Sequence, residues 1–136
     1  MRALPRTKAA EIYRRRYVEG PGFDQVAAIA PAVAEELVDT GVNMGPQVAA
    51  RFLQRALNGF SRGGRDWALL LVDGDLGEMS RSALRSFVAK RGEVGAKVLL
   101  ATLNGFQVER YFVLAEANPK LADFLFGWVR TRVAGL

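Results

Sequence analysis

The chain has 136 residues, of which 50% are hydrophobic and 24% are charged, a balance typical of one globular domain with a single core. It contains no cysteine and no histidine, which excludes disulfides, thiol chemistry, a Ser-His-Asp triad and a zinc site built on histidine. The formal net charge of +5 favours polyanionic partners such as nucleic acid, acidic lipid or an anionic cell wall.

The positive charge is concentrated at the N-terminus. Residues 1–16 contain six basic side chains and one acidic one, which equals the excess of the whole chain. Residues 6–19 are expected to form an amphipathic helix that the glycines at 20 and 22 end. The run at 14–16 spreads over about 200° of such a helix, so it predicts a solvated basic face and does not favour nucleic acid as a partner.

No targeting or membrane-spanning segment is visible in the sequence. The first sixteen residues lack the apolar stretch of a secretory signal, which predicts synthesis in the cytoplasm without a signal peptide. The longest apolar run, WALLLV at 67–72, is far too short to cross a bilayer. Membrane insertion is therefore not expected.

Two helices are predicted on either side of the stretch GVNMGP at 41–46. Pro31 opens the first at a favoured first helical position, and Pro46 opens the second in the same way. Apolar residues recur at three-four spacing from Ala49 to Phe60, the clearest amphipathic pattern in the chain. Gly41 or Asn43 is expected to end the first helix in the left-handed conformation, and Gly45 to let the chain turn. The stretch GVNMGP is therefore predicted to be a corner between two helices that pack against each other.

The second half of the chain is also predicted to be helical. The stretch VDGDLGEMS at 72–80 carries turn residues and leads into a helix over 81–88. A long helix is expected over 94–117, ended by Asn118-Pro119, and an amphipathic segment over 119–133 follows. With only one short and ambiguous strand pattern, the sequence predicts an all-α fold: a single compact bundle of about six helices.

A polar stripe runs along the otherwise apolar helix predicted over 94–117. Asn104, Gln107, Arg110 and Tyr111 lie at i, i+3, i+6 and i+7, on one side of the helix. Leaving such groups buried and unpaired costs about 1–3 kcal/mol each. They are therefore expected to bond to one another or to a neighbouring helix end, with Arg110 meeting Asp39 or the carbonyl groups of the 41–46 corner, or to line a groove for a ligand.

Four segments of the chain recur together, and in the same order, in one known family. They are KAAEIYRRRYVEGPGFDQV, AEELVDTGVNMGPQVAARFLQRALN, VDGDLGEMSRSALRSF and LLATLNGFQVERYFVLAEANPKLADFLFGWVRTRV. In combination they resemble the phage-type muramidases of glycoside hydrolase family 108, some of which are called secretion activator proteins. The resemblance implies a lysozyme-like single domain over 1–136. Residues 1–65 resemble the rear part of the hydrolase region, and residues 66–136 resemble its predicted peptidoglycan-binding region.

The resemblance also implies a catalytic glutamate that these 136 residues do not match. Family members carry it in a glycine-rich segment ahead of the helix equivalent to residues 6–19. Glu11 stands in AAEIYRRR, which is a different context. Because glycoside hydrolysis needs a carboxylic acid at the scissile oxygen, no catalytic residue is assigned, and peptidoglycan binding without turnover is the leading hypothesis. Neither a cofactor nor a metal is expected, since Asp73 and Asp75 lack the further ligands of a calcium loop.

The candidate site residues are the positions that match the family motifs. Those taken as substrate-binding residues of a groove are Asp39, Asn43, Gln107, Arg110 and Tyr111. Those taken as structural turn residues are Gly45, Asp73, Gly74 and Gly77. The expected partner is the peptidoglycan glycan strand, at the bacterial cell wall or periplasm after release, or on a phage virion. Two alternatives stay open: a fragment of an active N-acetylmuramidase (endolysin), and a non-enzymatic interaction or virion protein of a phage or prophage.

Overall fold

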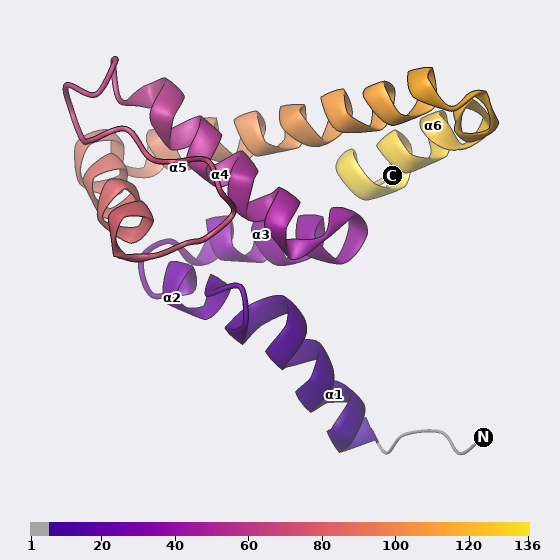
Figure 1. The fold of residues 1–136 in the computed structure, drawn as a ribbon, viewed down its shortest axis with the longest axis horizontal. Coiled ribbons are helices and arrows are strands. Elements are labelled where there is room, and N and C mark those ends of the chain that lie inside the picture. The colour runs from indigo at the N-terminus through magenta and orange to yellow at the C-terminus, as the bar shows by residue number, and fades with distance from the viewer. Residues whose placement is uncertain (1–5) are drawn as a thin grey trace.

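Helix α3 (Pro31–Met44) lies at the centre of the fold, which we describe for residues 6–136 in a computed structural model. It packs against α2 (Phe23–Ala27), α4 (Pro46–Phe60) and α5 (Glu78–Ala117) (Figure 1). Every regular element within the described residues is helical, and six of these elements are α-helices. The predicted all-α bundle of about six helices is therefore confirmed.

The corner between α3 and α4 is sharper and later than the sequence predicted. Neither Gly41 nor Asn43 leaves the helix; α3 continues to Met44, and Gly45 alone turns the chain, with a φ of 99°. Gly41 is instead a buried helical residue, where an added Cβ would lie 3.4 Å from the backbone of Pro46 and 3.5 Å from the ring of Phe23. These are ordinary contact distances, so the glycine needed for the turn is the one at 45.

The segment between α4 and α5 is irregular, and side chains of α4 hold it in place. The Asn58 side chain donates to the Leu70 carbonyl at 2.9 Å and accepts from the Leu70 N–H at 2.7 Å. The indole N–H of Trp67 donates to the Leu57 carbonyl at 2.9 Å. The apolar run at 67–72 is therefore not a strand; Trp67 and Leu70 enter the core from an extended segment fixed by polar bonds.

The buried apolar side chains form one cluster at the junction of these elements. They come from α2, α3, α4, the 61–77 segment and both halves of α5. The largest fully buried members are Phe23, Phe87, Leu37, Leu53, Leu57, Leu84, Leu99 and Leu103. Their helical spacing within each element is the pattern from which the helices were predicted.

Helix α5 spans 40 residues but bends sharply at Gly92. The backbone of Gly92 has a φ of 61° and a ψ of −148°, a conformation essentially restricted to glycine. The long helix predicted from Val94 is thus the second half of α5, and the helix predicted over 81–88 lies within its first half. Helix α5 therefore consists of two helical halves that meet at Gly92, where the chain changes direction.

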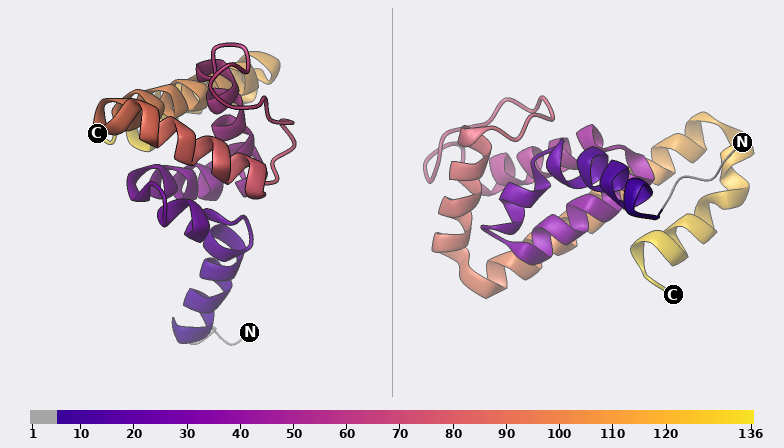
Figure 2. Two further views of the ribbon diagram at one scale, coloured as in Figure 1. Left: turned by 90° about the vertical axis from the view of Figure 1, so that its left-hand side faces the viewer. Right: turned by 90° about the horizontal axis from the view of Figure 1, so that it is seen from below.

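Two peripheral parts extend from this body. Helix α1 (Arg6–Arg14) projects away from it, as Figure 1 and the left view of Figure 2 show, and the following π-helical turn (Arg15–Glu19) packs against α2 and α3. At the other end, residues 119–133 fold back along the end of α5. This C-terminal hairpin comprises a 3-10 turn (Pro119–Leu121), α6 (Ala122–Trp128) and a π-helical turn (Val129–Val133).

The bend at Gly92 can be tested against a second glycine of the same helix. Gly92→Ala should lower the free energy of unfolding by about 1–3 kcal/mol, because alanine is strained at this backbone conformation. Gly105→Ala should raise it by up to about 1 kcal/mol, because Gly105 is helical with no atom within 4 Å of an added Cβ. Urea unfolding measures both; equal effects would contradict the glycine-specific bend.

Candidate functional site

One hydrogen bond joins α3 to the polar stripe of α5. The side-chain N–H of Gln107 donates to Glu36 Oε1 at 2.7 Å, and Gln107 is only 1% exposed. Within the described residues, Gln107 Oε1 is buried without a hydrogen-bond partner. The stripe is thus bonded to α3 through Gln107 and Glu36, which leaves one buried oxygen unmatched. The bond expected between Arg110 and Asp39 or the 41–46 corner is not formed among the described residues.

Gln107 Oε1 can receive a hydrogen bond from Glu36 only when Glu36 is protonated, and the surroundings of Glu36 favour its protonated form. Burial, and then the charge of Asp39, raise the pKa of Glu36, while the bond from Gln107 opposes this rise. Burial and the charge of Glu35 also raise the pKa of Asp39. A protonated Glu36 has an O–H that Gln107 Oε1 can accept once the amide has rotated, so the pair can hold Glu36 in either protonation state.

Exposed polar residues extend from this bond along both helices. Asp39 and Asn43 follow Glu36 at helical spacing on α3, and Arg110 follows Gln107 by three residues on α5. All three are exposed, so they are accessible to a large polymer. We call this surface the α3–α5 face; its residues are Glu36, Asp39, Asn43, Gln107 and Arg110.

The last residue of the stripe, Tyr111, fixes an aromatic cluster beside that face. Tyr111 is 2% exposed, and its ring centroid lies 5.3 Å from that of Trp128 in the C-terminal hairpin. Phe124 also stacks on Trp128, with the two ring centroids 6.0 Å apart. The Arg132 guanidinium lies 5.6 Å from the Trp128 ring, so Trp128 is half-buried between apolar and cationic neighbours. Gln107 and Tyr111 themselves are buried. Gln107 holds Glu36 through its hydrogen bond, and Tyr111 holds Trp128 by ring packing.

Two of the predicted turn residues, Asp73 and Gly74, are bonded to a different side chain, Gln54. Its Oε1 accepts from the backbone N–H groups of Asp73, at 3.1 Å, and Gly74, at 2.8 Å. Asp73 Oδ1 accepts from the N–H of Asp75 and from Gln54, and these bonds hold the pKa of Asp73 below its usual range. Gly74 has a φ of 80°, and Gly77 precedes the first residue of α5. The turn is thus built on a buried amide.

A polar hollow of about 420 Å³ separates this turn from the α3–α4 corner. Its lining comes from three segments far apart in the sequence: residues 20–21, 46–47 and 73–75. The corner and the turn were both predicted, but the sequence placed the groove between the corner and the stripe of α5. In the structure the hollow beside the corner faces Asp73–Asp75 instead.

Two site residues were missed by sequence reasoning, Glu36 and Gln54. Glu36 stands one residue before the buried Leu37, at the border of the apolar side of α3, where a carboxylate needs a partner. Gln54 lies between Leu53 and the buried Ala56 and Leu57 on the apolar side of α4. In both cases the signal in the sequence was a polar side chain on an apolar helical face. From the sequence, this inference was drawn for the stripe that contains Gln107, but not for Glu36 or Gln54.

Comparison with known families divides the chain at the α3–α4 corner. A family model described as "Predicted Peptidoglycan domain" matches residues 48–133, well over half of the chain. A second model, described as "Glycosyl hydrolase 108", matches residues 1–45. No curated protein matches the chain. The first match contains the Gln54 turn, Gln107 and Tyr111, and the second contains Glu36, Asp39 and Asn43.

The Glu36–Gln107 pair predicts how stability depends on pH. The pKa of Glu36 is raised on folding, so the contribution of Glu36 to stability is greatest below the unfolded value near 4.5 and is lost as pH rises through the raised folded value. In Glu36→Gln, the new amide can also donate to Gln107 Oε1, and the charge repulsion from Asp39 disappears. We expect this variant to be more stable than the native chain at pH 7 by about 1 kcal/mol.

Urea unfolding between pH 4 and pH 8 measures this effect. The advantage of Glu36→Gln should shrink toward pH 4, where Glu36 of the native chain is protonated. Glu116→Gln is the control, an exposed glutamate of the same helix as Gln107. An advantage that stays constant with pH, or that Glu116→Gln shares, would contradict the pairing.

Proposed function

The chain belongs to the predicted peptidoglycan domain family, and from this premise we propose that it binds peptidoglycan through the α3–α5 face and the adjoining Trp128 cluster. The observation that carries the proposal is the family match over residues 48–133. That resemblance is confirmed by both family matches.

The chemistry of this surface suits an acetylated sugar polymer. Such a polymer offers hydroxyl and amide groups at the edges of its rings and C–H groups on their faces. Asp39, Asn43 and Arg110 provide exposed acceptors and donors for the edges. Trp128 provides a flat apolar surface held by Tyr111, with the cation of Arg132 beside it. Gln107 contributes by fixing Glu36 rather than by touching the polymer.

We propose that binding takes place without hydrolysis by these residues. A glycosidase needs one carboxylic acid at the leaving oxygen and a second carboxylate, or an activated water, on the opposite side of the sugar. Glu36 and Asp39 have raised pKa values, yet both lie on the same helix, and Glu36 is engaged by Gln107. This arrangement serves hydrogen bonding better than it serves a pair of opposed carboxylates.

Hydrolysis of the glycan strand is the second candidate function, because residues 1–45 match the glycosyl hydrolase 108 model. If it occurs, Glu36 is the best general acid among the residues described, since it is half-buried and its pKa is raised. The two candidates share a substrate and differ in one measurable product, the reducing sugar end.

Peptidoglycan as the partner places the action of the protein at the cell wall. Within residues 6–136, no helix is long and apolar enough to pass through a bilayer. We propose a phage or prophage setting, in which the protein reaches the wall on release or as part of a virion. The resemblance to phage-type muramidases supports this setting.

Wall binding can be tested with two exposed residues of the α3–α5 face. The double variant Asn43→Ala/Arg110→Gln should sediment with purified sacculi about tenfold less tightly at moderate salt, because each lost hydrogen bond contributes about 0.5–1.5 kcal/mol. Its melting temperature should not change, since neither side chain is buried. Gln25→Ala/Arg65→Gln removes the same groups from exposed positions elsewhere and should bind normally. Failure of the native chain to sediment, or equal loss in both variants, would contradict the proposed face.

The absence of turnover needs a separate measurement. Sacculi incubated with the chain should release no soluble fragments and gain no reducing ends, while an added lysozyme releases both. Release that Glu36→Gln abolishes, with folding intact, would establish the hydrolytic candidate in place of simple binding.

A further inference from the structure

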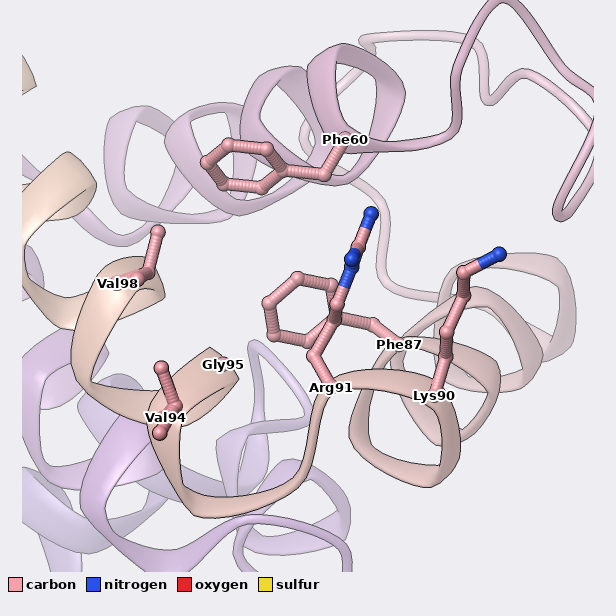
Figure 3. A pocket seen from close by; sticks show the side chains of 7 residues that line it. All are labelled: Phe60, Phe87, Lys90, Arg91, Val94, Gly95 and Val98. Atoms are coloured by element: carbon pink, nitrogen blue, oxygen red, sulfur yellow. The ribbon is translucent and has the colours of Figure 1, made fainter.

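The bend of α5 opens a pocket that the proposed wall-binding face does not include. Residues on both sides of the bend at Gly92 line this pocket beneath the end of α4. Figure 3 shows Phe87 and Arg91 on one side of it and Val94 and Val98 on the other. The pocket has a volume of about 460 Å³, within the usual range of small-molecule sites. It is lined by Phe60, Phe87, Lys90, Arg91, Val94, Gly95 and Val98.

The floor of the pocket is fixed before any ligand arrives. Phe87 is 2% exposed, and its ring centroid lies 5.8 Å from that of Phe60 and 6.0 Å from that of Trp67. Trp67 is in turn held by its bond to the Leu57 carbonyl. A floor of interlocked aromatic rings loses little conformational freedom on binding, which favours affinity.

One wall of the pocket is apolar and uncovered. Val94 is 72% exposed and Val98 is 45% exposed, and both point toward the hollow (Figure 3). Gly95 between them is buried, and a side chain there would collide with Arg91. Because Gly95 has no side chain, the pocket stays open between Val94 and Val98.

The charged groups of the pocket are both cations, Lys90 and Arg91, and none of the seven lining residues carries a carboxylate. Lys90 Nζ lies 2.9 Å from Asp66, which also pairs with Arg62 at 2.7 Å. Arg91 takes part in no ion pair among the described residues. Its guanidinium extends across the mouth toward Phe60 (Figure 3). The pocket thus presents an uncommitted cation above an apolar interior.

We propose that this pocket binds the C-terminal carboxylate of a short peptide with small apolar side chains. In the cell wall, this ligand would be the alanine-terminated end of a peptidoglycan peptide. Arg91 would hold the carboxylate through its planar pair of N–H groups, a geometry that suits carboxylates. The methyl groups of the terminal residues would pack against Phe87 and Val98. The choice of a peptidoglycan peptide rests on the proposed function. The more general ligand class, a carboxylate attached to small apolar groups, is inferred from the pocket alone.

Titration of the full chain with N-acetyl-D-alanyl-D-alanine, followed by amide chemical shifts, tests this assignment. Shifts should concentrate at residues 87–98 and give a millimolar dissociation constant, as expected for a small fragment. The C-terminal amide of the same peptide should bind at least about tenfold more weakly, because it lacks the charge that Arg91 recognises. Equal binding of the amide, or shifts elsewhere only, would overturn the proposal.

Two variants separate the charged group from the apolar wall. Arg91→Gln should weaken binding of the peptide about tenfold, and Val98→Thr should weaken it several-fold by placing a hydroxyl against the methyl groups. Arg15→Gln is the control for charge, since Arg15 is exposed on the projecting N-terminal part. Unchanged melting temperatures show that the fold is intact. Loss in Arg15→Gln equal to that in Arg91→Gln would overturn the site.

Two further outcomes distinguish this site from the proposed function. If sacculi bind but the peptide does not, the pocket assignment fails and wall binding stands. If the peptide binds with the expected variant effects but sacculi do not, the pocket stands as a carboxylate site and the proposed function fails. Octanoate binding more tightly than the peptide would overturn the choice of a peptide as the ligand.

Discussion

The fold depends most on the buried amide of Gln54. Its N–H group reaches oxygens of Asp73, Asp75 and Ser80, at 3.1, 2.9 and 3.2 Å. Its Oε1 accepts from the backbone at Asp73 and Gly74. One side chain of α4 therefore fixes both the end of the irregular 61–77 segment and the first turn of α5. Because α5 carries the bend, the pocket and Gln107, each of these features inherits its position from this amide.

Helix α5 connects the two surfaces for which we propose ligands. Before Gly92 it provides the aromatic floor and the cations of the pocket, and after Gly92 it provides Gln107, Arg110 and Tyr111. The two surfaces differ in character: the pocket has two cations above apolar walls, whereas the α3–α5 face has carboxylates and amides together with the guanidinium of Arg110. In a polymer that carries both sugars and short acidic peptides, the sugars would meet the α3–α5 face and the peptide carboxylate would meet the pocket. The bend at Gly92 sets the relative orientation of the two surfaces.

Part of the site could be predicted from the sequence, and part of it could not. The polar stripe of α5 was visible because polar residues at helical spacing stand out against an apolar helix. Its partner was not, since Glu36, Asp39 and Glu35 all lie near one another on α3 and only packing decides which of them meets Gln107. The pocket was invisible for the same kind of reason: Phe60 is distant in sequence from residues 87–98, and nothing in the sequence places them together.

The helices could be predicted without the structure, because apolar periodicity, prolines at first helical positions and the glycine at 45 are local signals. The family resemblance is equally a property of the sequence, since it depends on the order and spacing of motifs. The bend at Gly92, the turn around Gln54 and the bond from Gln107 to Glu36 are features of the packed helices alone. The physical reason is that a buried polar group must be bonded, yet which distant group bonds it is settled only when the helices pack.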